Sequence, residues 1–278
     1  MSDSEVDGGI PLIDPEFDTD TASKKRKRGA ETGATDDPKK AAKKAKRKEK
    51  KKQKLKAIDA DELDEVLHVN HAFERMDSQL LADYINSRTR LYGKDLSSVE
   101  LEDRAIPARI IKDTTDWGEP RTLENLAAFV MKQGSTMKQT SSKSTGAPHT
   151  IVVTASGIRA ADAFRALKTG LSNQGVKNPN VAKLFAKHMK IAEQVEHLKK
   201  HKVDFGVGTP ERLSALLDQK ALSTANLKRV LIDVSYIDQK KRGILDMKEL
   251  HEPLIKLLLR SEFVGEAKHD GDDLMTFY

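Results

Sequence analysis

The sequence predicts an α/β protein built on a single parallel-sheet lobe, which occupies residues 149–261. Two observations support this fold class. Short β-branched runs alternate with helical stretches after residue 148, and residues 57–278 are enough to build one sizeable core. We expect a helical extension with surface loops over residues 57–148, a disordered charged tail over 1–56 and an acidic C-terminal tail over 262–278.

The tail holds the charge asymmetry of the chain, whose formal net charge is +6. Residues 1–20 contain seven acids and no base, whereas residues 21–56 contain 17 Lys and Arg against four acids. The rest of the chain has 32 residues of each sign. Because the tail has few apolar side chains, it cannot offset the entropy of becoming ordered, and we expect it to be disordered when free.

Basic runs of this kind are typical of nuclear import signals, and they also suit contacts with RNA phosphates. The sequence leaves both functions open, because such runs are weakly specific. The residues assigned to this import and RNA-contact tail are Lys24, Lys25, Arg26, Lys27, Arg28, Lys46, Arg47 and Lys48.

Two helices are expected in the extension. Apolar residues at helical spacing lie within Met76–Tyr92, and Asp77 or Ser78 is able to cap this helix. Thr122 is expected to start the second helix. Residues 93–117 are polar and irregular, and residues 133–148 are rich in Ser, Thr and Gly, so both are expected to be loops.

Strands and helices then alternate through the lobe. The expected strands are His149–Ala155, Lys202–Val207 and Arg229–Asp233, and the expected helices are Ile158–Leu171, the helix after Thr209, and Ile244–Leu259. Thr209 followed by Pro210 is a strong helix start, because the hydroxyl can cap the helix and proline needs no N–H there. Periodicity leaves Val181–Ala186 open as a strand or a helix.

Three short motifs occur within the lobe in a characteristic order and spacing. Thr-Pro-Glu-Arg is found at Thr209–Arg212, Asp-Val-Ser-Tyr at Asp233–Tyr236, and Val-Thr-Ala-Ser-Gly-Ile at Val153–Ile158. By their order and spacing these segments resemble motifs Ib, II and Ia in the first RecA-like lobe of DEAD-box RNA helicases. In this alignment Lys187 and His188 replace a Gly-Gly pair of the helicases. The resemblance implies a RecA-like lobe.

ATP chemistry is not expected of this lobe. No G-x-x-x-x-G-K-[ST] occurs in the chain, so the backbone cradle for phosphates and the lysine for the outer phosphates are missing. Asp233 keeps only the first carboxylate of motif II, because Val234 follows it. We therefore expect no catalytic residue, no cofactor and no small-molecule substrate. The alternative is an ATP-dependent RNA helicase-like enzyme, or one lobe of a split ATPase.

The resemblance implies that the RNA-contacting side survives. A helix N-terminus attracts phosphate through its free N–H groups and dipole, and residues 159–202 hold ten bases against three acids. Plain helix capping and an ordinary solvated surface remain open as alternatives. The expected RNA-binding residues are Thr154, Ser156, Arg159, Lys187, Thr209, Pro210 and Arg212, with Asp233 as the remnant of motif II.

Other site classes have little support. The chain has no cysteine, no stretch of about 18 apolar residues and an acidic N-terminus, so neither a membrane protein nor a secreted one is expected. His68 and His71, and likewise His197 and His201, have metal-ligand spacing. No third ligand follows at a recognisable spacing, so we expect no metal site.

The segments FAKHMK at Phe185–Lys190 and VGTPERL at Val207–Leu213 add detail to this pattern. Together with the degenerate lobe and the charged tail, they are similar to the Cms-one family of fungal ribosome-biogenesis factors. The resemblance implies a noncatalytic assembly factor for pre-rRNA processing and small-subunit assembly, located in the nucleus and nucleolus. Its implied partners are pre-rRNA, guide snoRNA and other proteins of the small-subunit processome, an early pre-ribosome.

Overall fold

The computed structural model describes residues 62–134, 144–186, 189–264 and 274–278. The assigned tail residues and Lys187 lie outside these ranges, so the roles predicted for them stay predictions. Within the described residues, no helix combines the length and apolar character needed to cross a membrane.

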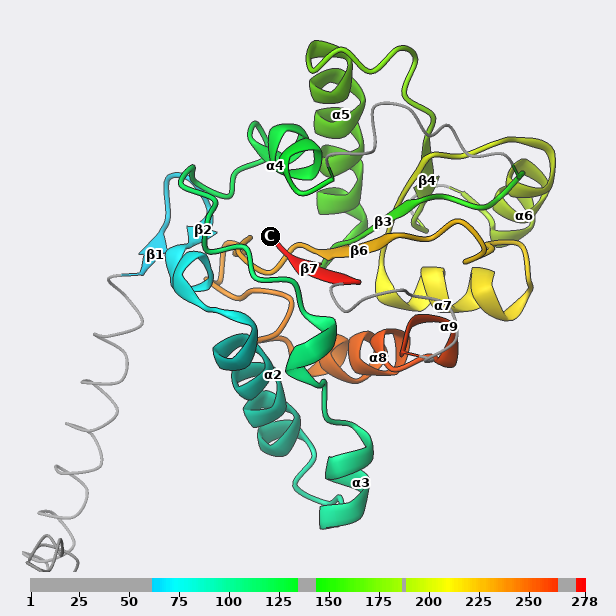
Figure 1. The fold of residues 1–278 in the computed structure, drawn as a ribbon. Coiled ribbons are helices and arrows are strands. Elements are labelled where there is room, and N and C mark those ends of the chain that lie inside the picture. Colours follow the sequence, from blue (N-terminus) through cyan, green and yellow to red (C-terminus); the bar gives the residue numbers. More distant parts are fainter. Residues whose placement is uncertain (1–61, 135–143, 187–188, 265–273) are drawn as a thin grey trace, which may run out of the picture. The chain divides into compact units, whose positions relative to one another are not determined.

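A five-stranded parallel sheet forms the centre of the lobe (Figure 1). Its strands lie in the order β4-β5-β3-β6-β7 and all neighbours run parallel. Their bounds are β3 Thr150–Val153, β4 Val181–Leu184, β5 Phe205–Gly208, β6 Arg229–Ile232 and β7 Met275–Phe277. Every residue of β3, β5 and β6 is buried, as expected for strands covered on both faces. The predicted α/β class is confirmed.

The strand β7 falls within residues 262–278, where the sequence pattern indicates an acidic tail. Its apolar run is only a few residues long and stands beside acidic residues, so the pattern does not reveal it. Met275 and Phe277 pack on one face of the sheet and Tyr278 on the other. Beyond β7, Ile111 forms a parallel bridge with Met275, and the N–H of Lys112 donates to the Met275 carbonyl at 2.8 Å.

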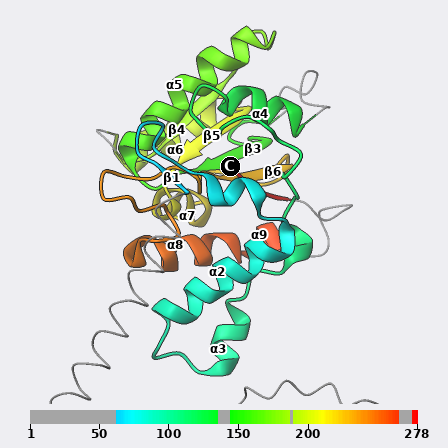
Figure 2. The same ribbon diagram turned by 90° about the vertical axis from the view of Figure 1, so that its left-hand side faces the viewer.

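Helices cover both faces of the sheet (Figures 1 and 2). The helices α4, Leu126–Lys132, and α5, Gly157–Asn173, lie on one face. The other face carries α6, Ile191–Lys200, α7, Pro210–Asp218, α8, Lys248–Leu258, and the short α9, Ser261–Val264. Each face has its own buried cluster, so the sheet is the middle layer of three.

The first part of the extension, residues 62–110, packs against the lobe on the α8 side, whereas α4 lies on the opposite face. This first part consists of the hairpin β1, Leu63–Asp64, and β2, Val69–Asn70, the 3₁₀ helix η1, His71–Arg75, and the helices α2, Ser78–Tyr92, α3, Ser98–Asp103, and η2, Ala108–Ile110. Of the two residues predicted as caps, Asp77 caps α2, and its carboxylate accepts from the N–H of Leu80 at 2.8 Å. The predicted loop over 93–117 is wrong in part, because Ser97 and Glu100 form a capping box that starts α3.

Three helix starts differ in detail from the prediction. Pro210 opens α7 as expected, but the Thr209 hydroxyl makes no capping hydrogen bond. The helix α4 begins at Leu126 rather than after Thr122. The helix α8 begins at Lys248 rather than Ile244, because the preceding residues form a turn in which the N–H of Gly243 donates to the Asp246 carboxylate at 3.1 Å.

Candidate functional site

The carboxyl ends of the parallel strands meet at one edge of the sheet, where α5, α6 and α7 begin. The pairing of β3 with β5 brings two predicted motifs together there. The N–H of Thr154 donates to the carbonyl of Gly208 at 2.9 Å, and the Thr154 hydroxyl lies 3.3 Å from the same oxygen. Ser156 and Thr209 follow directly. We name Ser156, Thr209 and Arg212 the carboxyl-edge site.

Two other predicted residues, Arg159 and Asp233, bind each other. The Nε of Arg159 donates to Oδ2 of Asp233 at 2.6 Å, and Nη2 donates to Oδ1 at 3.2 Å. The two side chains are 8% and 4% exposed, and Arg159 Cζ lies 4.1 Å from the centre of the Tyr236 ring. Burial alone would lower the pKa of Arg159, but the Asp233 carboxylate raises it above its ordinary value.

This pairing corrects the expectation that Arg159 contacts RNA, because a buried and paired guanidinium has no face open to a phosphate. The side chains of Thr154 and Pro210 are also buried, so they are not exposed for such a contact either. Ser156 is exposed, and its hydroxyl oxygen caps α5 by accepting from the N–H of Arg159 at 3.2 Å. Ile158, close to Ser156 in the sequence, is 66% exposed.

Arg212 lies in the first turn of α7, as predicted, and is half-buried. Its Nη1 donates to the carbonyl of Met189 at 3.2 Å and to Oε1 of Gln194 at 3.0 Å. Nε and Nη2 make no hydrogen bond to a described residue. The guanidinium is therefore held in place through one nitrogen, and no described residue uses its other donors.

Gln194 is a structural residue that the sequence analysis missed. Its side chain is 1% exposed, and Nε2 donates to the carbonyls of Lys183 at 3.0 Å and Phe185 at 2.9 Å. These carbonyls belong to β4 and the residue after it, at the outer edge of the sheet. One amide thus ties the edge strand to α6 and also positions Arg212. No sequence signal marks it, because glutamine in a basic amphipathic helix resembles a solvated residue.

Arg121 and Tyr278 were also missed. Arg121 is 0% exposed and donates to the carbonyl of Phe277 at 2.9 Å and to Oγ1 of Thr114 at 3.0 Å. Burial lowers the pKa of Arg121 to about 10, so the guanidinium stays charged at neutral pH. The hydroxyl of Tyr278 donates to the carbonyl of Thr122 at 2.5 Å, and its main-chain oxygen accepts from the N–H groups of the two residues after Asp233.

Two histidine pairs have metal-ligand spacing in the sequence. The rings of His197 and His201 stack with centroids 4.3 Å apart, and no described residue joins them as a third ligand. Across the described ranges, no cluster of three His, Asp or Glu side chains is placed to hold a metal ion.

The comparison with family models decides the family. The model described as CMS1, U3-containing 90S pre-ribosomal complex subunit, matches residues 18–278. The chain belongs to the CMS1 family. This family membership makes the protein an assembly factor of ribosome biogenesis and a component of a pre-ribosomal complex, as the sequence resemblance implied.

Curated relatives agree with this family. Protein CMS1 of Chaetomium thermophilum is 48% identical over 217 residues, which is 76% of this chain and 84% of the relative. Protein cms1 of Schizosaccharomyces pombe is 31% identical over 71% of this chain and 69% of the relative. Protein CMSS1 of Homo sapiens is 36% identical over 39% of this chain and 37% of the relative.

Solved structures similar to the chain are DEAD-box proteins. Saccharomyces cerevisiae Dbp5 bound to Nup159, Gle1, IP6 and ADP gives a TM-score of 0.40 at 13% identity, covering 69% of this chain and 45% of that one. A DEAD box protein from Methanococcus jannaschii gives a TM-score of 0.35 at 20% identity, covering 53% and 36%. At these scores the likeness adds nothing to the fold argument, which rests on the parallel sheet itself.

Proposed function

We propose that this CMS1-family protein is a noncatalytic RNA- and protein-binding subunit of an early pre-ribosome, acting in the nucleus and nucleolus. The RNA partners in this proposal are pre-rRNA and the guide snoRNA of the particle, and the protein partners are its other assembly factors. The family description, which names a U3-containing complex, supports this choice of partners. In the proposal the basic tail directs import and adds nonspecific contacts with RNA phosphates.

The carboxyl-edge site is the part of the lobe that we assign to RNA. The observation that carries this assignment is the state of Arg212, which is fixed through Nη1 and has Nε and Nη2 unused by the described residues. It stands at the N-terminus of α7, a nine-residue helix whose first N–H groups and dipole favour an anion. Exposed Ser156 lies on the neighbouring loop. Such a site fits a phosphate of the RNA backbone.

A basic surface continues from this site along β4 and α6. The exposed bases there are Lys183, Lys190, Lys199, Lys200 and Lys202. Lys183 also stacks over the Phe164 ring, with Nζ 4.8 Å from the ring centre. Exposed lysines attract a polyanion without reading its sequence, so they would strengthen binding while the carboxyl-edge site positions it.

The segment between Ile111 and α4 supports a noncatalytic role. A P-loop lies between a strand and a helix, and this segment has that topology because Ile111 bridges β7 and α4 follows. Its loop has a single glycine, Gly118, and no Gly-Lys pair. The buried guanidinium of Arg121 fills the loop and donates to Thr114 and Phe277. The loop thus has a buried arginine in place of the glycines and the lysine with which a P-loop binds phosphates.

Crosslinking with sequencing of the bound RNA tests the role of the lobe. We expect Arg212→Glu to remove crosslinks that map to the lobe, whereas Lys168→Glu, the same charge change at an exposed site on α5, leaves them in place. Deleting residues 24–56 should lower total crosslinking and its salt dependence without moving the crosslinked RNA positions. If only the tail deletion removes crosslinks, the lobe does not bind RNA.

An ATPase assay of the full chain with RNA tests the noncatalytic role. We expect no turnover above the background of a mock purification. RNA-stimulated turnover that co-purifies with the chain would refute the proposal and favour the helicase-like alternative. Substitution of Asp233 is a poor diagnostic in this assay, because Asp233 neutralises buried Arg159 and its loss affects folding.

A further inference from the structure

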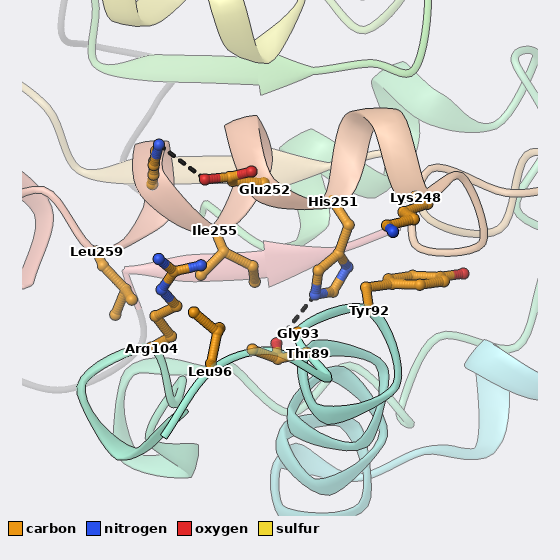
Figure 3. A pocket seen from close by; sticks show the side chains of 11 residues that line it. Thr89, Tyr92, Gly93, Leu96, Arg104, Lys248, His251, Glu252, Ile255 and Leu259 are labelled. Atoms are coloured by element: carbon orange, nitrogen blue, oxygen red, sulfur yellow. Dashed lines mark hydrogen bonds and ion pairs between the residues drawn. The ribbon is translucent and has the colours of Figure 1, made fainter. Parts of the chain in front are cut away.

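A cavity of about 280 Å³ lies away from the carboxyl-edge site, between α8 and the chain that joins α2 to α3 (Figure 3). It approaches the usual size range of ligand pockets. Its walls come from the end of α2, the turn after it, the end of α3 and one side of α8. The proposed function makes no use of this cavity.

The floor of the cavity is apolar. Leu96, Ile255 and Leu259 line it, and all three are labelled in Figure 3. The Tyr92 ring packs edge-on against His251, with centroids 5.1 Å apart. A floor of this kind favours a large apolar side chain over water or a sugar-phosphate chain.

His251 supplies a buried polar atom that has no partner. Its side chain is 3% exposed, and Nε2 lies 2.9 Å from the Thr89 hydroxyl oxygen. Because that hydroxyl donates to the Ile85 carbonyl at 3.1 Å, it accepts from an Nε2–H, which leaves the lone pair on Nδ1. Nδ1 is buried without a hydrogen-bond partner. Burial, with a smaller effect from Arg88, lowers the pKa of His251 to about 4, so the ring is neutral.

The rim of the cavity is basic. Arg104, Lys248, Lys256 and Glu252 line it, and only Lys256 and Glu252 pair with each other, at 2.9 Å. Arg104 is half-buried and makes no hydrogen bond or ion pair with a described residue, and neither does Lys248. In Figure 3 the Arg104 guanidinium points toward Ile255 across the cavity. Glu100 and Glu252 interact electrostatically with Arg104, but the three bases of the rim outnumber its one acid, so the cavity has a basic rim above an apolar floor.

We infer that this cavity docks an acidic peptide segment of a partner protein, with a large apolar side chain on the floor and a neighbouring carboxylate on Arg104. Charge complementarity between the basic rim and the peptide selects an acidic segment. RNA would satisfy the cations but would leave the apolar floor without a partner. This inference goes beyond the proposed function, because it concerns a different face of the protein.

Nuclear magnetic resonance of the full chain, labelled at Ile and Leu methyl groups, tests the inference. The probe is the acetylated and amidated peptide EDLFDE. We expect it to shift the methyl signals of Leu96, Ile255 and Leu259. Arg104→Glu should weaken this binding at least about tenfold, a loss of about 1.4 kcal/mol. These signals report on the cavity even if the basic tail also attracts the peptide.

Matched controls test whether the peptide binds in the cavity and whether binding needs both its acidic and its apolar side chains. Arg109→Glu, a charge reversal at an exposed residue outside the cavity, should leave the shifts unchanged. If Arg104→Glu alters the melting temperature, Lys248→Glu at an exposed rim position replaces it. The inference fails if EDLFDE causes no shift at about 1 mM, the weak end of specific binding. It also fails if KKLFKK, EDSSDE or an RNA oligonucleotide shifts the same methyl groups equally.

Discussion

The guanidinium of Arg159 and the carboxylate of Asp233 form a buried ion pair across 74 residues of sequence, with two hydrogen bonds of 2.6 and 3.2 Å. The pair joins α5 to the end of β6. Asp233→Ala should therefore lower the free energy of unfolding by about 3–5 kcal/mol, because it leaves Arg159 charged and buried without compensation. Urea unfolding followed by circular dichroism measures the change.

The double variant Arg159→Met with Asp233→Leu is the control for this pair. Removing both charges should recover most of the lost stability, because apolar residues of similar volume often replace a buried ion pair at little cost. A loss below about 1 kcal/mol in Asp233→Ala alone would contradict this prediction. It would mean that the charge of Arg159 does not depend on Asp233 for compensation.

Gln194→Ala should destabilise the lobe by about 1–3 kcal/mol. The substitution leaves the carbonyls of Lys183 and Phe185 without their side-chain donor and frees Arg212. Thermal unfolding measures the change, with Glu196→Ala as a control on an exposed position of the same helix. Equal melting temperatures for the two variants would contradict the bridging role of the amide.

Gly170→Ala should also be destabilising, although alanine is the better helix former by about 1 kcal/mol. An added Cβ at Gly170 would lie 2.5 Å from the Cβ of Ala127, so α4 and α5 would have to separate. The double variant Gly170→Ala with Ala127→Gly should regain stability in urea unfolding, because it restores the space between the helices. Independent, additive effects of the two substitutions would refute this contact.

The free energy of unfolding should decrease as the pH is lowered through the range in which two buried histidines take up a proton only in the unfolded chain. Burial lowers the pKa of both His149 and His251 to about 4, from an ordinary value near 6.5. Between these values the unfolded state binds more protons, so stability falls as the pH decreases, by up to about 1.4 kcal/mol per pH unit for each histidine.

Urea unfolding near pH 7 and near pH 5 measures this dependence. His251→Gln should unfold more easily at both values but show a shallower pH slope, because one of the two groups is gone. An unchanged slope would assign the acid sensitivity to other groups.

Local patterns in the sequence were sufficient for the strands and helices of the lobe. The β-branched runs at Thr150–Val153 and Arg229–Ile232 are strands, and the periodic segment Gly157–Asn173 is a helix. The segment Leu274–Tyr278 could not be identified, because five residues are too short for periodicity. It becomes a strand only through tertiary pairing with β6.

In the candidate site, too, local motifs predicted some positions, and tertiary contacts determine the others. The motif spacing correctly brought Thr154 and Thr209 to one edge, since parallel strands end together. It could not foresee that Arg159 is neutralised by Asp233, because a pair separated by 74 residues leaves no local pattern. Arg121 was missed for a related reason. A buried arginine bonded to main-chain carbonyls looks in the sequence like any exposed base.

The strand β7 ties the completion of the fold to the order of synthesis. The N–H of Val230 donates to the carbonyl of Leu274 at 2.9 Å, and the N–H of Tyr278 donates to that of Ile232 at 2.8 Å. A nascent chain emerges N-terminus first, so β6 lacks its second neighbour until residues 274–278 have left the ribosome. Until then β6 presents an unpaired edge of the kind that promotes aggregation. The second edge of β6 is therefore covered only after every other strand of the sheet has been synthesised.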